Sequence, residues 1–295
     1  FNSNGYTLAL SQPLFRWQNW VAFDQSKYQV AQAEAAFVQA GQDLILRVAQ
    51  AYFDVLYAIE NLNAVRTTKA SIEQQLESAK RNFEVGTATI VDSQEAQSRF
   101  DLAVAQEIAA ESELEVRQRT LQAIIGREPG ALAPLRRNAE IPQPQPADMK
   151  QWASAAESGN INVQIQTAAL EIAAREVERQ RAGHYPTVDL VANVGKSTAF
   201  ATVGGQLETE FQNVGVQLSL PIFQGGLVRS RQTEASANRA ATESTLEQTR
   251  RNAALLARQN YLGSVNGLAQ VRALKAALVS SQSSLESNRL GFDVG

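Results

Sequence analysis

The stretch Leu8-Ala-Leu-Ser-Gln-Pro-Leu-Phe15 returns as Val216-Gln-Leu-Ser-Leu-Pro-Ile-Phe223, 208 positions further along the chain. A second stretch, ESAKRNFEVG at residues 77–86, returns 209 positions later as ESNRLGFDVG at residues 286–295. An offset that changes by one residue over about seventy positions indicates a duplicated structural unit rather than a shared short motif. We therefore divide the chain into a first repeat, residues 1–147, and a second repeat, residues 148–295.

Three segments alternate apolar and polar residues with the period of a β-strand that has one apolar face: 5–15, 187–197 and 213–222. Residues 198–212, which are rich in Gly and Thr, are predicted to form a long hairpin loop. Alternation of this kind also occurs in soluble sheets. In a membrane the apolar face would meet lipid, and its residues are Tyr6, Leu8, Leu10, Val188, Leu190, Val214, Val216, Leu218 and Leu220.

Each strand that ends near Pro13 or Pro221 leads into a long helical pattern. Residues 19–85 contain no Pro and predict a helix about 100 Å long, at 1.5 Å per residue. Apolar residues recur there at spacings of three, four and seven, which favours a coiled-coil seam facing a partner helix. A returning helix is predicted over residues 89–125.

The rest of the chain is predicted as a Pro-rich linker at 129–146, one helix at 148–182 and then the second strand. If the duplication is complete, a helix and a strand should precede the first residue. A returning helix should likewise follow the last residue. We therefore expect the sequence to be a fragment of a longer protein.

Composition excludes several function classes. The chain has 295 residues, no Cys and a net charge of −3, which argues against a disulfide framework, a thiolate metal site and a nucleic-acid partner. The single histidine, His184, has no second ligand of its kind. Neither a phosphate-binding loop nor a nucleophile elbow is present. We expect no enzymatic activity, no metal and no cofactor.

Two tryptophans, Trp17 and Trp20, follow the first strand at its junction with the helix. Aromatic residues gather at membrane–water interfaces, so these positions are predicted to lie there. Strands cross a bilayer only within a closed barrel, because every backbone polar group must be paired. Three or four strands cannot close around a lumen, so several chains must contribute.

Four motifs carry a resemblance that covers essentially the whole chain: AYFDVL at 51–56, FEVGT at 83–87, GHYPTVDL at 183–190 and LSLPIFQGG at 218–226. In combination and order they resemble the TolC-type outer-membrane efflux proteins. The resemblance implies a mostly helical α+β membrane protein of three chains, in which an outer-membrane β-barrel continues into a coiled-coil α-barrel through the periplasm.

The resemblance also implies a function and its partners. The protein would be a passive exit duct in the outer membrane of a Gram-negative bacterium, with a long periplasmic extension. It would act as a homotrimer with a periplasmic adaptor protein and an inner-membrane transporter, exporting drugs or a polypeptide. A soluble coiled-coil scaffold and an enzyme are the alternatives, and the sequence offers no catalytic constellation for the latter.

The resemblance assigns roles to few residues. Two turns at equivalent repeat positions would be the helical tips where the adaptor docks: Val85, Gly86 and Thr87, and then Val294 and Gly295. The alternative for each is an ordinary helix C-cap. Asp92 would tether the closed entrance, although Phe292 stands where a partner Tyr is usual and has no hydroxyl to donate. The alternative for Asp92 is a carboxylate favoured by the helix dipole.

Overall fold

The computed structural model describes residues 3–136, 141–201 and 205–294. It contains two compact units, one of Phe1–Gln39 with Gln143–Gly295 and one of Ala40–Pro142. Helix α1 (Trp17–Glu84) contributes to both units, and each unit is described here by itself. The two units are defined by which residues pack together. They therefore do not test the predicted boundary between the repeats after residue 147, which stays a prediction.

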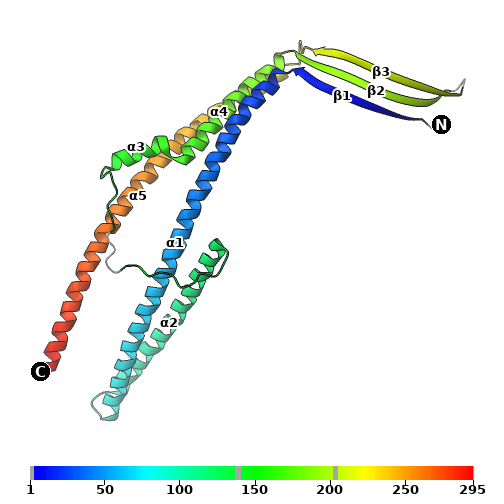
Figure 1. The fold of residues 1–295 in the computed structure, drawn as a ribbon. Coiled ribbons are helices and arrows are strands. Elements are labelled where there is room, and N and C mark those ends of the chain that lie inside the picture. Colours follow the sequence, from blue (N-terminus) through cyan, green and yellow to red (C-terminus); the bar gives the residue numbers. More distant parts are fainter. Residues whose placement is uncertain (1–2, 137–140, 202–204, 295) are drawn as a thin grey trace. The chain divides into compact units, whose positions relative to one another are not determined.

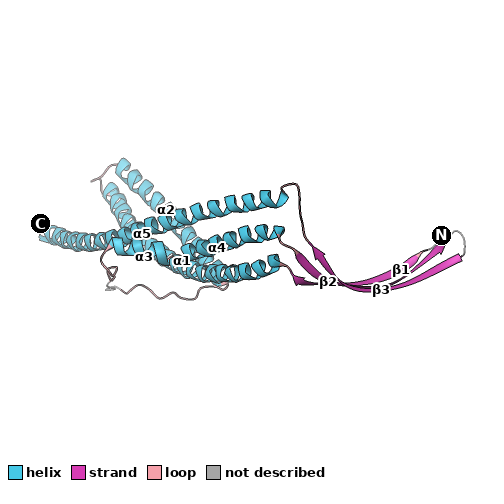
Figure 2. Cartoon of the chain, turned by 90° about the horizontal axis from the view of Figure 1, so that it is seen from above, coloured by secondary structure: helices cyan, strands magenta, loops and turns pink. Residues whose placement is uncertain are grey.

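The first unit contains an antiparallel sheet of β1 (Asn4–Phe15), β2 (Thr187–Ala201) and β3 (Gly205–Ser219), in the order β1-β2-β3 (Figures 1 and 2). The prediction of a loop at 198–212 is wrong, because β2 and β3 stay paired as far as Ala201 opposite Gly205. Residues 202–204 lie outside the described part.

Cross-strand chemistry explains why these polar segments form strands. Lys196 on β2 forms ion pairs with Glu208 and Glu210 on β3, and opposite charges across a strand pair stabilise it. The other end of β3 is shorter than predicted, because the strand stops at Ser219. Pro221 follows, and its ring nitrogen cannot donate to a strand ladder.

The helices of the first unit are α3 (Met149–Gly159), α4 (Ile161–Arg181) and α5 (Leu227–Val294), with a short 3-10 turn, η1 (Ala182–His184), before β2. The prediction of one helix over 148–182 is wrong, because the chain breaks at Asn160. That residue has an extended backbone, with φ −65° and ψ 135°, and its side chain accepts a hydrogen bond from the Asn162 N–H. An Asn in this position starts a new helix.

Two small cores hold the first unit together. Val163, Leu246 and Ala253 are buried among α4 and α5, and Ala156 of α3 packs against them. Nearer the strands, Val21, Ala182 and Val228 are buried on α1, η1 and α5. A Cβ on Gly183 would lie 3.2 Å from Val228 Cγ1. The helices therefore approach closely at the point where the strands begin.

The second unit is a hairpin formed by residues 40–84 of α1 and by α2 (Ile90–Ile125). Its core is Ala51, Val55 and Leu121, with Ile59 and Leu114 packed around it. The Tyr52 hydroxyl donates to the Ala133 carbonyl oxygen at 2.6 Å. This hydrogen bond ties the segment after α2 back onto α1.

A charged cluster links the two helices of the hairpin. Glu107 on α2 accepts from Arg66 Nε at 2.9 Å and from Lys69 Nζ at 2.7 Å, both on α1. Arg66 also donates to Glu111 at 2.6 Å. Hydrogen bonds from Lys69 and then from Arg66 lower the pKa of Glu107.

We expect Glu107→Gln to lower the thermal midpoint of the assembled protein at neutral pH, because it leaves Lys69 without its ion-pair partner. A lowered carboxyl pKa contributes stability above the ordinary Glu pKa, and that contribution is lost as the pH falls through the lowered value. The difference between wild type and variant should therefore shrink on acidification, as calorimetry can measure. Glu113→Gln is the control, because it breaks an exposed pair within α2; an equal effect there would contradict the role of Glu107.

Candidate functional site: an apolar sheet face and a helical tip

The strand register gathers most of the predicted lipid-facing residues on one side of the sheet. Residues that oppose each other across paired strands point to the same face, and the face alternates along each strand. Leu10 opposes Ala192, which opposes Val214. Eight predicted residues share this apolar face: Tyr6, Leu8, Leu10, Val188, Leu190, Val214, Val216 and Leu218. Leu220 lies beyond the end of β3.

The described part of the chain leaves this apolar face largely uncovered. Leu8 is 69% exposed, Val214 78% and Leu218 67%. Contiguous exposed apolar surface on this scale marks an interaction site. Its contact with lipid stays a prediction.

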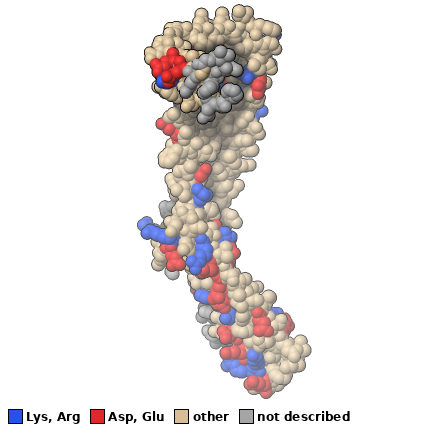
Figure 3. Space-filling model, turned by 90° about the vertical axis from the view of Figure 1, so that its right-hand side faces the viewer, with Lys and Arg blue, Asp and Glu red and all other residues tan. Residues whose placement is uncertain are grey.

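Charge bounds the apolar face at the hairpin end. Lys196 and Glu210 oppose each other in the row after Val194, with Lys196 Nζ 3.3 Å from Glu210 Oε1. In the view of Figure 3 most charged side chains lie over the helices and few lie over the strands. From Val188 to Val194 the apolar rows cover about 20 Å at 3.3 Å per residue. That length approaches the outward apolar band of about 25 Å in membrane β-barrels.

The opposite face of the sheet is more polar, although it also carries Val191 and Phe211. Asn193 opposes Asn213, and Asp189 opposes Gln217. The register therefore places Asn193 and Asp189 on the face away from the apolar residues. Gly195 lies on this face beneath the Phe211 ring, where a Cβ would come within 2.5 Å of Phe211 Cζ.

Sequence reasoning missed an ion pair at the strand-to-helix junction, between an exposed arginine and a buried aspartate. Arg16 Nε and Nη2 donate to Asp189 Oδ1 and Oδ2, both at 2.9 Å. Asp189 is 8% exposed, so it is paired rather than bathed in water. The signal that could have indicated this ion pair is the arginine that directly follows the first strand. In the structure Arg16 is the only residue between β1 and α1. Trp17 and Trp20, both exposed, occupy the first turn of α1 directly after it.

The first predicted tip is the turn between α1 and α2. Gly86 has a φ of +78°, a left-handed conformation that Gly adopts readily. The Asn82 carbonyl oxygen accepts from the Thr87 N–H at 2.8 Å and from the Thr87 hydroxyl at 3.0 Å. Val85 is 73% exposed. The turn is therefore a hydrogen-bonded cap that displays an apolar side chain.

Asp92 lies just after this turn, as the third residue of α2. Its carboxylate accepts from the Thr89 backbone N–H at 2.8 Å, and the Thr89 hydroxyl accepts from the Asp92 N–H at 3.3 Å. This reciprocal pair is a capping box. The Thr89 backbone hydrogen bond is the main cause of a lowered pKa at Asp92. The capping role accounts for Asp92 within this chain, and its tethering role stays a prediction.

The second predicted tip falls at the end of the described part. Helix α5 extends to Val294, and Gly295 lies outside the described residues. The turn expected there and its docking role are untested.

Asp92→Asn should loosen the first tip, because the amide is a weaker acceptor for the Thr89 N–H. Amide hydrogen exchange at residues 87–92, measured by mass spectrometry at neutral pH, should become faster. Gln97→Ala is the control, because Gln97 bonds only within α2. Because the pKa of Asp92 is lowered, the difference should vanish in strong acid as the native carboxyl protonates. Unchanged exchange at neutral pH would contradict the capping role.

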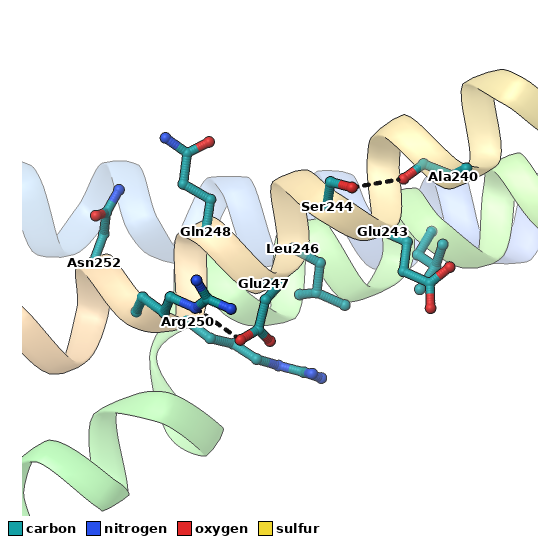
Figure 4. A pocket seen from close by; sticks show the side chains of 10 residues that line it. Ala240, Glu243, Ser244, Leu246, Glu247, Gln248, Arg250 and Asn252 are labelled. Carbon is teal, nitrogen blue, oxygen red and sulfur yellow. Dashed lines mark hydrogen bonds and ion pairs between the residues drawn. The ribbon is translucent and has the colours of Figure 1, made fainter.

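The described residues also form a groove outside the sheet and the first tip. An open groove of about 820 Å³ lies between α4 and α5, lined mainly by polar side chains of α5 with Leu170 of α4 (Figure 4). Its Arg251 is paired with Glu247 at 2.9 Å. The described residues include no group of three or more His, Cys, Asp or Glu side chains suited to a metal ion. None of the described helices has the length and apolarity needed to cross a membrane.

A sheet with an exposed apolar face, joined to very long helices, is the arrangement of a membrane-associated protein. Comparisons with known proteins identify the family. The family described as "Outer membrane efflux protein" matches residues 1–127 and 152–295. The chain belongs to this family, and it is an outer-membrane protein of a Gram-negative bacterium. The soluble-scaffold alternative is not supported.

Individual relatives agree with this assignment. Outer membrane protein TolC of Vibrio cholerae is 32% identical over 97% of this chain and 66% of its own length. Alkaline protease secretion protein AprF of Pseudomonas aeruginosa is 29% identical over 100% of this chain and 62% of its own length. The chain therefore spans slightly less than two thirds of these relatives, which are channel and secretion proteins rather than enzymes.

Solved structures show the same fold. The Campylobacter jejuni CmeC outer membrane channel superposes with a TM-score of 0.76 at 15% identity, over 100% of this chain and 69% of that one. The fold of an outer-membrane efflux channel subunit, mostly helical with a small antiparallel sheet, is thus established for this chain.

Proposed function

We propose that three copies of the full-length protein form a hollow conduit across the outer membrane and periplasm, the passive exit duct of a tripartite efflux or type I secretion system. An inner-membrane transporter would supply the energy, and a periplasmic adaptor would recruit the duct at its helical tips. The chain itself would perform no chemistry.

The sheet carries this proposal. It has one exposed apolar face and one polar face, and both β1 and β3 are edge strands within the described chain. In lipid every backbone N–H and C=O must be paired, so an open sheet is excluded and a closed barrel is required. Strands from further copies would complete the wall, with Leu218 toward lipid and Asn213 toward a water-filled lumen.

The helices support assembly as well. Large apolar side chains on α1 stay exposed in the single chain, such as Phe37 at 81% and Ile45 at 70%. The buried positions are often alanines, such as Ala51, Ala103 and Ala110. Small residues allow close helix approach, while the exposed apolar ones would be covered by neighbouring helices of other copies. At the first tip, exposed Val85 would meet the adaptor.

The cargo is the open part of the proposal. Similarity to an alkaline protease secretion protein supports a polypeptide cargo, whereas the name of the family supports efflux of small molecules. A strain that lacks the gene distinguishes the two cargoes. Loss of an extracellular protein would indicate a polypeptide cargo, and loss of resistance to toxic compounds would indicate efflux of small molecules.

Conductance tests the duct directly. The purified full-length protein, placed in a planar lipid bilayer, should give stable single-channel currents. Opening by the adaptor should raise the conductance, and Val85→Asp should weaken that response because it charges the proposed docking surface. Ser98→Asp, at an exposed position of α2, is the control. A bilayer that stays electrically silent with correctly folded protein, with and without adaptor, would contradict the proposal.

A further inference from the structure

The two repeats join strand to helix in different ways. In the first repeat, Arg16 alone separates β1 from α1, and we call it the first connection. In the second repeat, residues 220–226 separate β3 from α5, and we call them the second connection. At the offset that brings Pro13 onto Pro221, Gln224 stands in the place of Arg16.

The first connection is held by a geometrically demanding contact. Both bonds from the Arg16 guanidinium to the Asp189 carboxylate measure 2.9 Å, and a two-pronged pair of this kind restricts orientation as well as distance. Asp189 belongs to β2 and opposes Pro13 of β1. The ion pair therefore ties the start of α1 to the middle strand of the sheet.

The described residues show no comparable side-chain tie for the second connection. The Gln224 side chain makes no hydrogen bond within the described residues, and Ile222 and Phe223 are 92% and 86% exposed. Gly225 and Gly226 have φ values of +59° and +84°, and a Cβ at either would meet nothing within 4 Å. Open backbone with few contacts is where a chain bends most readily.

The two repeats correspond again just beyond the connections. Val21 on α1 and Val228 on α5 are both buried, 207 positions apart. The helices therefore begin in equivalent surroundings, although only one of them is tied to the sheet.

We propose that Arg16 and Asp189 are positioning residues that lock α1 to the sheet, whereas the second connection is a joint about which α5 changes its angle to β3. In the conduit proposed above, on which this role rests, the helix of the first repeat would hold its place under the barrel. The helix of the second repeat would be free to reorient.

Pairs of spin labels measure both connections in one protein. The sequence contains no cysteine. Spin labels can therefore be attached to cysteines introduced at Thr7 and Gln29, one on either side of the first connection. Gly215 and Ser236 are the equivalent positions for the second connection, shifted by 208 and 207 residues. All four residues are exposed. Labelled full-length chains would be diluted with unlabelled ones in lipid nanodiscs, so that each assembly carries one pair.

In the wild-type background we expect a narrow distance distribution for the first pair and one about twice as wide for the second, as for a hinge. Arg16→Gln, which copies the residue of the second repeat, should widen the first distribution to match the second. Arg251→Gln, which breaks an exposed pair within α5, should change neither.

Equal widths in the wild-type background would overturn the proposal, and so would an unchanged width in an assembled Arg16→Gln protein. If that variant fails to assemble, the wild-type comparison decides by itself. The oligomeric mass of the same sample tests the conduit separately, so a wrong oligomer and a wrong joint are distinguishable.

Discussion

Replacing Val216 with Arg is expected to reduce the assembled outer-membrane form at least tenfold at equal expression. Val216 lies in the middle of the apolar rows of β3 and is 65% exposed. An Arg facing lipid near the bilayer midplane costs about 2–4 kcal/mol in a membrane barrel. Semi-native gels of outer-membrane fractions measure the effect, because the assembled and unassembled forms migrate differently.

Asn213→Arg is the matched control, because Asn213 lies on the same strand and points to the polar face opposite Asn193. We expect near wild-type assembly there. Gln217, which lies on the same face as Asn213, is a poorer control, because it opposes Asp189, the partner of Arg16. Equal losses at positions 216 and 213 would show that the assigned faces are wrong.

Gly195→Ala should be the most damaging small substitution in the sheet. A Cβ there would lie 2.6 Å from the backbone oxygen of Tyr6 and 2.5 Å from Phe211 Cζ. The ring can rotate away, but the Tyr6 oxygen can move only if β1 shifts relative to β2. Overpacking of this kind typically costs about 1–3 kcal/mol, so we expect reduced assembly and a lower thermal midpoint.

Gly215→Ala is the control on the same polar face, because an added Cβ meets nothing within 4 Å. It should be neutral or slightly stabilising, since Ala restricts the unfolded chain more than Gly does. The double variant Gly195→Ala with Phe211→Ala should recover only part of the loss, because the Tyr6 contact remains. Full recovery would mean that the ring alone required the glycine.

The sequence was sufficient for the elements that depend on local periodicity. The bounds of α1, α2 and β1 follow closely from apolar spacing and from Gly86. The internal duplication indicated the corresponding strand and long helix of the second repeat, β3 and α5. The break at Asn160 was missed because the apolar period continues across it, and only the hydrogen bond to the Asn162 N–H exposes the cap.

The remaining errors of the sequence-based predictions concern contacts between residues that are far apart in the chain. Arg16 and Asp189 are 173 positions apart, and no local pattern indicates that they meet. The ladder beyond residue 197 was likewise missed, because polar residues there depend on cross-strand partners such as Lys196 and Glu208 rather than on an apolar face. The tips at Gly86 and Gly295 were predicted by resemblance, and their docking role stays a prediction.

The mass of the full-length protein in mild detergent tests the central claim most directly. In the proposed conduit, strands of further copies would pair with the edge strands of the described sheet and close the barrel wall. Light scattering of protein extracted from the outer membrane should therefore give three polypeptides per particle. A folded, monodisperse particle containing one polypeptide would contradict the account.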